Sequence, residues 1–120
     1  MPRILVVDDE PDVLEFQKAF LSRRKHEVQT AATFKEAIEA VKNFLPDIIF
    51  CDVRLDSDTT GLDILQQAKS LKPDVIFYLI TGLVDKEVEE KGQALGAREV
   101  LSKPISNEKL EEKIKQAVPN

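Results

Sequence analysis

Residues with reactive side chains follow short apolar runs in this sequence. Asp52 comes directly after the run 48–51, and the runs 3–7, 75–80 and 99–101 are followed by acidic, hydroxyl or basic side chains. These strand-end residues are Asp8, Asp9, Asp52, Thr81 and Lys103. Taken alone, Asp52 could simply end its strand and solvate a loop. The interpretation therefore depends on whether the strand-end residues converge.

The charges of the strand-end residues indicate a cation site. The three aspartates contribute −3 and Lys103 contributes +1, which leaves −2 in one pocket if the side chains meet. Clustered carboxylates raise one another's pKa values and destabilise a fold unless a cation lies among them. Mg²⁺ suits such a site because it binds a few carboxylates and keeps several waters. We therefore expect Mg²⁺, with Mn²⁺ as the alternative ion.

A carboxylate beside Mg²⁺, with a lysine and a hydroxyl in reach, is equipped for phosphoryl transfer. Asp52 would attack in line, while Mg²⁺ and Lys103 neutralise charge on the phosphoryl oxygens. Thr81 would donate a hydrogen bond to one of those oxygens, and Gly82 leaves that approach open because it has no side chain. The residues thus predict phosphorylation of Asp52.

The elements that must position these residues alternate along the chain. Apolar periodicity predicts strands at 3–7, 27–30, 48–51, 75–80 and 99–101, and helices that begin near residues 11, 34, 61, 84 and 107. Alternation with short connections implies an α/β fold with a parallel sheet and helices on both faces. In such a sheet, chemistry collects outside the carboxyl ends of the strands. The strand-end residues would converge if the first, third, fourth and fifth strands lie side by side.

Local signals predict the helix ends and inner faces. Pro11 opens the first helix, Thr33 with Glu36 and Thr60 with Asp63 form capping boxes, and Ser106 caps the last helix. The expected inward-facing residues are Val13, Phe16, Ala19 and Phe20, then Ala37, Ile38, Val41, Phe44 and Leu45, then Leu62, Leu65, Ala68 and Leu71, and finally Leu110, Ile114, Ala117 and Val118. Helix 84–95 has few core residues, so we expect it to be loosely anchored, with Gly96 as its C-cap.

Composition limits the class of protein. A chain of 120 residues, 42% hydrophobic and 32% charged, predicts one soluble domain over 1–120. We expect no membrane contact, because the apolar runs are too short for a span and the chain does not start with a signal peptide. A single cysteine excludes an internal disulfide and predicts a reducing cytoplasm, with Cys51 in the core. The net charge of −5 argues against a nucleic-acid surface.

Four motifs in order resemble the receiver domain of two-component response regulators. They are ILVVDDEP at 4–11, IIFCDVRL at 48–55, LITG at 79–82 and LSKP at 101–104. The resemblance covers essentially the whole chain. It implies a flavodoxin-like (βα)5 fold, a three-layer sandwich with five parallel strands in the order 2-1-3-4-5.

The resemblance also implies a role for each site residue. By it, Asp52 is the phosphoacceptor, Asp9 binds Mg²⁺ directly, Asp8 acts through water, the backbone carbonyl of Arg54 is the remaining protein ligand, Thr81 is the switch hydroxyl and Lys103 is the phosphate-binding lysine. The family typically has a cis bond at the position of Lys103–Pro104.

The function that this resemblance implies is a phosphorylation-controlled signalling switch. A histidine kinase or phosphotransfer protein would supply the phosphoryl group, and the receiver would catalyse its own modification without being a classical enzyme. The modified state would rearrange the fourth helix, fifth strand and fifth helix, through which an effector or a second copy could bind. One alternative is a receiver-like binding module that works without phosphorylation. Another is a phosphatase with an aspartyl-phosphate, although such enzymes usually have D-x-D-x-[TV], whereas Asp8 and Asp9 are adjacent.

The sequence departs from the family pattern in two places. Asp56 stands where a proline is usual, four residues after the acceptor, and Gly61 lies nine rather than eight residues after it. Val100 stands where the fifth strand usually has Tyr or Phe, so no aromatic ring is available there to turn inward.

Three further features of the sequence carry weaker signals. Asp56, Asp58, Thr60 and Gly61 match the first half of a calcium loop, but Gln67 stands where such a loop needs a bidentate Glu. His26 lies far along the chain from the strand-end residues, which predicts a solvated loop residue. Tyr78, within the fourth strand, is predicted to pack in the core.

Overall fold

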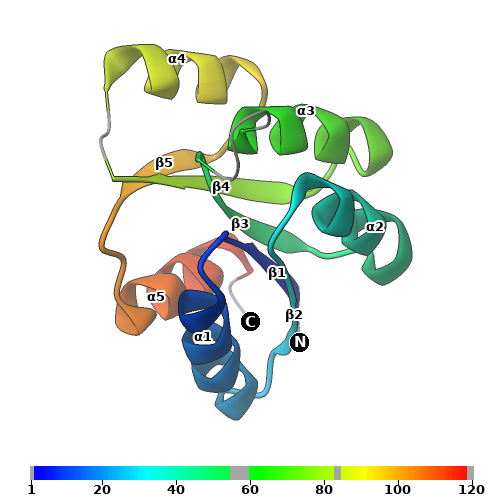
Figure 1. Cartoon of the computed structure of the whole chain (residues 1–120), viewed down its shortest axis with the longest axis vertical. Coiled ribbons are helices and arrows are strands. Elements are labelled where there is room, and N and C mark those ends of the chain that lie inside the picture. Colours follow the sequence, from blue (N-terminus) through cyan, green and yellow to red (C-terminus); the bar gives the residue numbers. More distant parts are fainter. Residues whose placement is uncertain (1, 55–59, 83–84, 119–120) are drawn as a thin grey trace.

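A five-stranded parallel sheet forms the middle layer of the protein (Figure 1). The structure is a computed structural model, and it describes residues 2–54, 60–82 and 85–118. The elements are β1 (Arg3–Val7), α1 (Pro11–Arg23), β2 (Glu27–Ala31), α2 (Phe34–Phe44), β3 (Ile48–Asp52), α3 (Gly61–Leu71), β4 (Ile76–Thr81), α4 (Lys86–Ala94), β5 (Glu99–Ser102) and α5 (Asn107–Ala117). The sheet order is β2-β1-β3-β4-β5, which confirms the predicted order.

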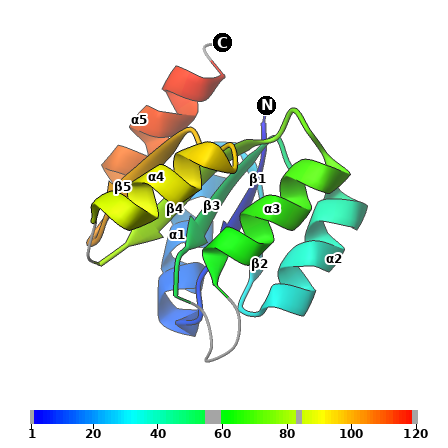
Figure 2. The same cartoon turned by 90° about the horizontal axis from the view of Figure 1, so that it is seen from above.

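Alternation along the strands divides the apolar core into two layers. Ile4 and Val6 of β1 point to one face of the sheet, and Leu5 and Val7 point to the other. All five residues of β3 are buried, as expected for a central strand that is covered on both faces. The layer that contains Leu5 packs against α2, α3 and α4, and the layer that contains Ile4 packs against α1 and α5 (Figures 1 and 2).

Side-chain caps fix where several helices begin. The Thr33 hydroxyl accepts a hydrogen bond from the Glu36 amide at 3.1 Å, while the Glu36 carboxylate accepts from the Ala32 amide at 2.8 Å. The predicted capping box at Thr33 therefore differs in one bond, because the Glu36 carboxylate accepts from the amide of Ala32 and not from that of Thr33. Both halves of the box predicted at Thr60 are present, and Ser106 caps α5 through the Lys109 amide. Gly96 follows the end of α4 with a positive φ of 105°.

The predicted inner face of α1 is wrong in part. Phe20 packs against the layer that contains Ile4, as predicted, and Val13 is half-buried. Leu14, Gln17 and Leu21 are the buried residues of this helix, whereas Phe16 is 68% exposed and Ala19 is exposed. The prediction favoured the two phenylalanines and therefore excluded the polar Gln17. Because 3.6 residues make a turn, Gln17 must face inward once Leu14 and Leu21 do.

The ends of two other predicted helix faces are also corrected. Leu45 is 50% exposed because the chain turns left-handed there, with φ 52°, as α2 ends before Pro46. Leu71 is 42% exposed at the end of α3, and Ile64, near the start of that helix, is buried although it was not predicted to be. The fourth helix is shorter than predicted, and Gly92 is its buried residue in the described part of the chain.

His26 is not a solvated loop residue, contrary to the prediction. Its Nε2 lies 3.1 Å from the Glu111 carboxylate of α5, and its side chain is only 11% exposed. Cys51 and Tyr78 are buried as predicted, and Tyr78 stacks on Phe50. Asp56 and Asp58, which carry the loop departure and the calcium pattern, lie outside the described residues.

Candidate functional site

The predicted strand-end residues meet at one edge of the sheet. Asp8 and Asp9 follow β1, Asp52 is the last residue of β3, Thr81 ends β4, and Lys103 comes directly after β5. The register holds these ends level, since β3 pairs with β1 and β4 and the pair Asp52↔Ile80 lies next to Thr81. All of the strand-end residues except Asp8 border an open cavity of about 540 Å³, which is lined by Asp9, Glu10, Asp52, Val53, Arg54, Thr81, Gly82, Asp85, Val88 and Lys103.

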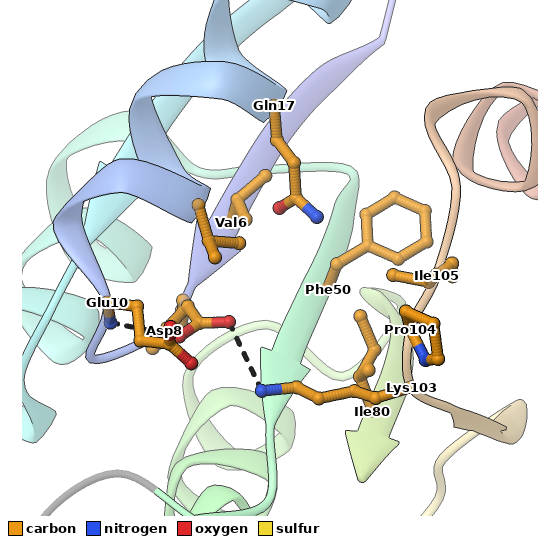
Figure 3. A pocket seen from close by; sticks show the side chains of 11 residues that line it. Val6, Asp8, Glu10, Gln17, Phe50, Ile80, Lys103, Pro104 and Ile105 are labelled. Carbon is orange, nitrogen blue, oxygen red and sulfur yellow. Dashed lines mark hydrogen bonds and ion pairs between the residues drawn. The ribbon is translucent and has the colours of Figure 1, made fainter. Parts of the chain in front are cut away.

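Lys103 joins the acidic groups at this edge. Its Nζ donates a hydrogen bond to Asp52 Oδ2 at 2.7 Å and lies 3.5 Å from Asp8 Oδ2 (Figure 3 shows the contact with Asp8). The Lys103 amide donates to the Thr81 carbonyl at 2.8 Å, which fixes the start of the lysine side chain beside β4. The peptide bond between Lys103 and Pro104 is cis, as the resemblance implied.

The two oxygens of the Asp52 carboxyl group have different partners. Oδ2 accepts from Lys103, and Oδ1 accepts from the backbone amide of Arg54 at 3.1 Å. The side chain is only 7% exposed, so these bonds hold it in one orientation at the mouth of the cavity. Gly61 lies so close to the backbone of Asp52 that a Cβ at this position would lie against the Asp52 carbonyl.

Burial and neighbouring charge shift the protonation equilibria of two site residues. Burial raises the pKa of Asp8 above its ordinary value, and the charges of Asp52 and Asp9 add to this effect. The Glu10 amide and the Lys103 ammonium oppose it, but do not cancel it. For Lys103, burial lowers the pKa, yet the hydrogen bond to Asp52 and the charges of Asp52 and Asp8 raise it above its ordinary value. Lys103 is therefore a fixed cation at neutral pH.

The acidic groups at the end of β1 suit a hard cation. Carboxylate oxygens of Asp8, Asp9 and Glu10 lie within 4.8 Å of one another. Asp9 and Glu10 are exposed, and burial raises the pKa of Asp8, so a nearby cation would favour the charged form of Asp8. Oxygen ligands of this kind match the preference of Mg²⁺.

Three residues of this region were missed by the sequence interpretation. Glu10 extends the acidic group, and its place directly after Asp8 and Asp9 was a usable signal. Asp85 borders the cavity as the N-cap of α4, accepting from the Val88 amide at 2.8 Å. The third is Gly61, whose contact with the Asp52 backbone depends on how α3 packs on β3, which spacing alone does not show.

The space near Thr81 agrees with its predicted position. Thr81 is 7% exposed at the end of β4, and Gly82 beside it leaves open space where a side chain would stand. The backbone carbonyl of Arg54 is predicted as a metal ligand. The backbone amide of the same residue donates a hydrogen bond to Asp52. No helix in the described part of the chain has both the length and the apolar character needed to cross a membrane.

Proteins of known class match this chain over nearly its whole length. The regulatory protein LuxO of Vibrio vulnificus is 30% identical over 115 residues, which cover 94% of this chain and 25% of that protein. The response regulator protein PilR of Pseudomonas aeruginosa is 31% identical over 116 residues, covering 97% of this chain and 26% of that protein. The chain thus spans about a quarter of the length of these relatives.

Solved structures show the same architecture. A CheY-like response regulator receiver domain protein from Methanospirillum hungatei JF-1 superposes with a TM-score of 0.90 at 31% identity, covering 97% of this chain and 92% of that one. The beryllofluoride-activated NtrC4 receiver domain, solved as a dimer, gives a TM-score of 0.88 at 33% identity, covering 99% and 98%. The family model of the response regulator receiver domain matches residues 4–115. This protein therefore belongs to the family of response regulator receiver domains, whose function is phosphorylation-based signalling.

Proposed function

We propose that Asp52 is the phosphoacceptor of a two-component signalling switch. The observation that carries this proposal is the position of Lys103 Nζ, 2.7 Å from Asp52 Oδ2 and 3.5 Å from Asp8 Oδ2. One ammonium group from the end of β5 thereby meets the acids at the ends of β3 and β1, at the mouth of an open cavity.

Phosphoryl transfer needs a nucleophilic oxygen and compensation of charge. An oxygen of Asp52 forms the new P–O bond as the P–N bond of a phosphohistidine breaks, and the imidazole nitrogen leaves with the electron pair and takes a proton. Lys103 would then exchange its hydrogen bond to the carboxylate for one to a phosphoryl oxygen. Thr81, at the end of the neighbouring strand, would donate to another phosphoryl oxygen.

Receiver domains bind Mg²⁺ at an acidic pocket, and the acidic groups of this protein fit that ion. Here Asp9, Asp52 and the Arg54 carbonyl would hold it directly, and Asp8 would act through water. When bound, the ion supplies positive charge that offsets the charge on the phosphoryl oxygens. Mn²⁺ would serve in the same way.

Receiver domains of response regulators interact with histidine kinases and with effector domains. For this protein we propose a histidine kinase or a phosphotransfer protein as donor, and an effector or a second copy as the partner of the α4–β5–α5 face. That face carries a pair of hydrogen bonds, each 2.9 Å long, from the nearly buried Lys113 ammonium to the Glu99 carboxylate. It also brings Gly92 of α4 close to Val100.

Intact-mass spectrometry after incubation with acetyl phosphate and Mg²⁺ tests the proposal. We expect one phosphoryl adduct that requires Mg²⁺ and is absent from the Asp52→Asn variant. Asp74→Asn is the matched control, because its exposed carboxylate lies outside the site. If no adduct forms, even at short times, and a beryllofluoride mimic does not bind, Asp52 is not a phosphoacceptor. The protein would then be a binding module that works without phosphorylation.

A further inference from the structure

A second cavity lies on the other side of the Asp8–Lys103 contact, between α1 and the segment that follows β5 (Figure 3). Its volume is about 240 Å³. Its apolar wall consists of Val6, Val13, Phe50, Ile80, Pro104 and Ile105. The wall therefore combines β1, α1, β3, β4 and the segment after β5, which makes it a feature of the whole fold rather than of one loop.

Gln17 is the polar group inside this otherwise apolar cavity. Its residue is 6% exposed, and Figure 3 shows its side-chain amide directed into the space beside Phe50. Among the residues that the structure describes, none forms a hydrogen bond with this amide. Its amide atoms are not fully enclosed, so water or a ligand in the cavity can pair with them.

Of the other polar side chains at the cavity, those of Asp8 and Lys103 are already paired, and Glu10 is exposed. Asp8 accepts from the Glu10 amide at 3.0 Å and lies against Lys103, which in turn donates to Asp52. A charged ligand would have to compete with these contacts, whereas a neutral ligand would leave them in place. The Gln17 amide faces the same cavity and offers a ligand one acceptor oxygen and two donor hydrogens.

The size and chemistry of the cavity define what it would bind. A carboxamide matches another carboxamide, because each supplies both a donor and an acceptor. An apolar cavity of about 150 Å³ is enough to bind benzene, so 240 Å³ leaves room for one ring with a small polar substituent. We propose that this cavity binds a small uncharged aromatic carboxamide, with Gln17 as the residue that recognises it.

This site would be coupled to the phosphoacceptor site. Asp8 and Lys103 form part of its border, and the same two side chains face Asp52. A ligand that fixes their positions would alter events at Asp52, and those events would alter its affinity by the same factor. The binding itself does not require phosphorylation, so the Asp52→Asn variant, which cannot be phosphorylated, should still bind the ligand. Failure of one proposal therefore leaves the other standing.

Chemical-shift mapping by two-dimensional NMR tests the proposal, with benzamide and toluene as probes. Benzamide should shift the Gln17 side-chain amide and the signals of Val13 and Ile105, and it should bind more tightly than toluene, which has the ring but no amide. Gln17→Leu should weaken benzamide binding about tenfold, the effect of losing one to two hydrogen bonds, while toluene binding is kept. Gln67→Leu, on the exposed face of α3, is the matched control and should change neither affinity.

Three results would overturn the proposal. The first is the absence of benzamide-induced shifts at these residues in the wild-type protein, a result that needs no variant to fold. The second is an unchanged benzamide affinity in Gln17→Leu. A water molecule held beside the Gln17 amide, seen as a cross-relaxation signal that benzamide does not remove, would show that the site is a hydration site only.

Discussion

Burial is the strongest influence on the protonation of Asp8, and the Glu10 amide and the Lys103 ammonium oppose it without cancelling it. The pKa of this carboxyl group is raised, so the folded protein binds its proton more tightly than the unfolded chain does. Stability from this group is fully present below the unfolded pKa of about 3.9 and is lost as the pH rises through the folded pKa. At neutral pH the ionised Asp8 therefore lowers the stability of the metal-free protein.

Replacing Asp8 by Asn should raise the melting temperature of the metal-free protein at neutral pH by a few degrees. Asn keeps an oxygen that accepts from the Glu10 amide but carries no charge. Thermal unfolding in EDTA at several pH values checks this expectation, and the advantage over wild type should shrink as the pH falls. Asp9→Asn is the control with little effect, because Asp9 is exposed. An advantage that grows toward low pH would contradict the argument.

Gly61 and Gly82 offer a matched pair of tests at the same scale. A Cβ on Gly61 would lie against the Asp52 backbone carbonyl, whereas a Cβ on Gly82 would meet nothing within 4 Å. Gly61→Ala should lower the free energy of unfolding by about 1–3 kcal/mol, as overpacking usually does. Gly82→Ala should change it far less. Urea unfolding distinguishes the two, and equal effects would refute the steric explanation.

At the scale of the elements, helix phase and helix pairing are hard to read from sequence. The strands were predicted well because most of them contain unbroken apolar runs, such as residues 48–51 of β3, and parallel strands bring their carboxyl ends to one edge. The site followed from that rule. The face of α1 did not, because Gln17 is buried while Phe16 is exposed. Apolar periodicity cannot show a polar residue that faces a cavity formed by other elements.

His26 shows a second kind of information that local sequence lacks. Its partner Glu111 lies 85 positions away, so no local pattern connects them. Their contact ties the turn between α1 and β2 to α5. His26→Ala should lower the free energy of unfolding by about 1–3 kcal/mol, since it leaves a largely buried carboxylate unpaired.

A double-mutant cycle with Glu111→Gln separates pairing from packing in this contact. We expect a coupling energy above about 0.5 kcal/mol between the two positions, as for residues in direct contact. Gln116→Ala, on the exposed side of α5, is the control and should show no coupling to His26. Additive effects of His26→Ala and Glu111→Gln would mean that the pair does not join the two elements energetically.

For the whole molecule, a cation at the acidic groups should stabilise the fold. A ligand that binds only the folded state adds about 2.7 kcal/mol when its concentration is 100 times its dissociation constant. Urea unfolding should therefore show a higher free energy of unfolding in Mg²⁺ than in EDTA, with K⁺ at equal ionic strength as the control. Asp9→Asn should remove most of the gain. An equal gain in that variant would place the ion elsewhere.

The division of the core by the sheet has a mechanical consequence for anything that binds the α4–β5–α5 face. The α4 helix belongs to the layer shared with α2 and α3, while α5 belongs to the layer shared with α1. Between them, β5 contributes Val100 to one layer and Leu101 to the other. A partner that contacts both helices would therefore be sensitive to the position of one packed layer relative to the other. Even a small slip of one layer would change the spacing that the partner has to match.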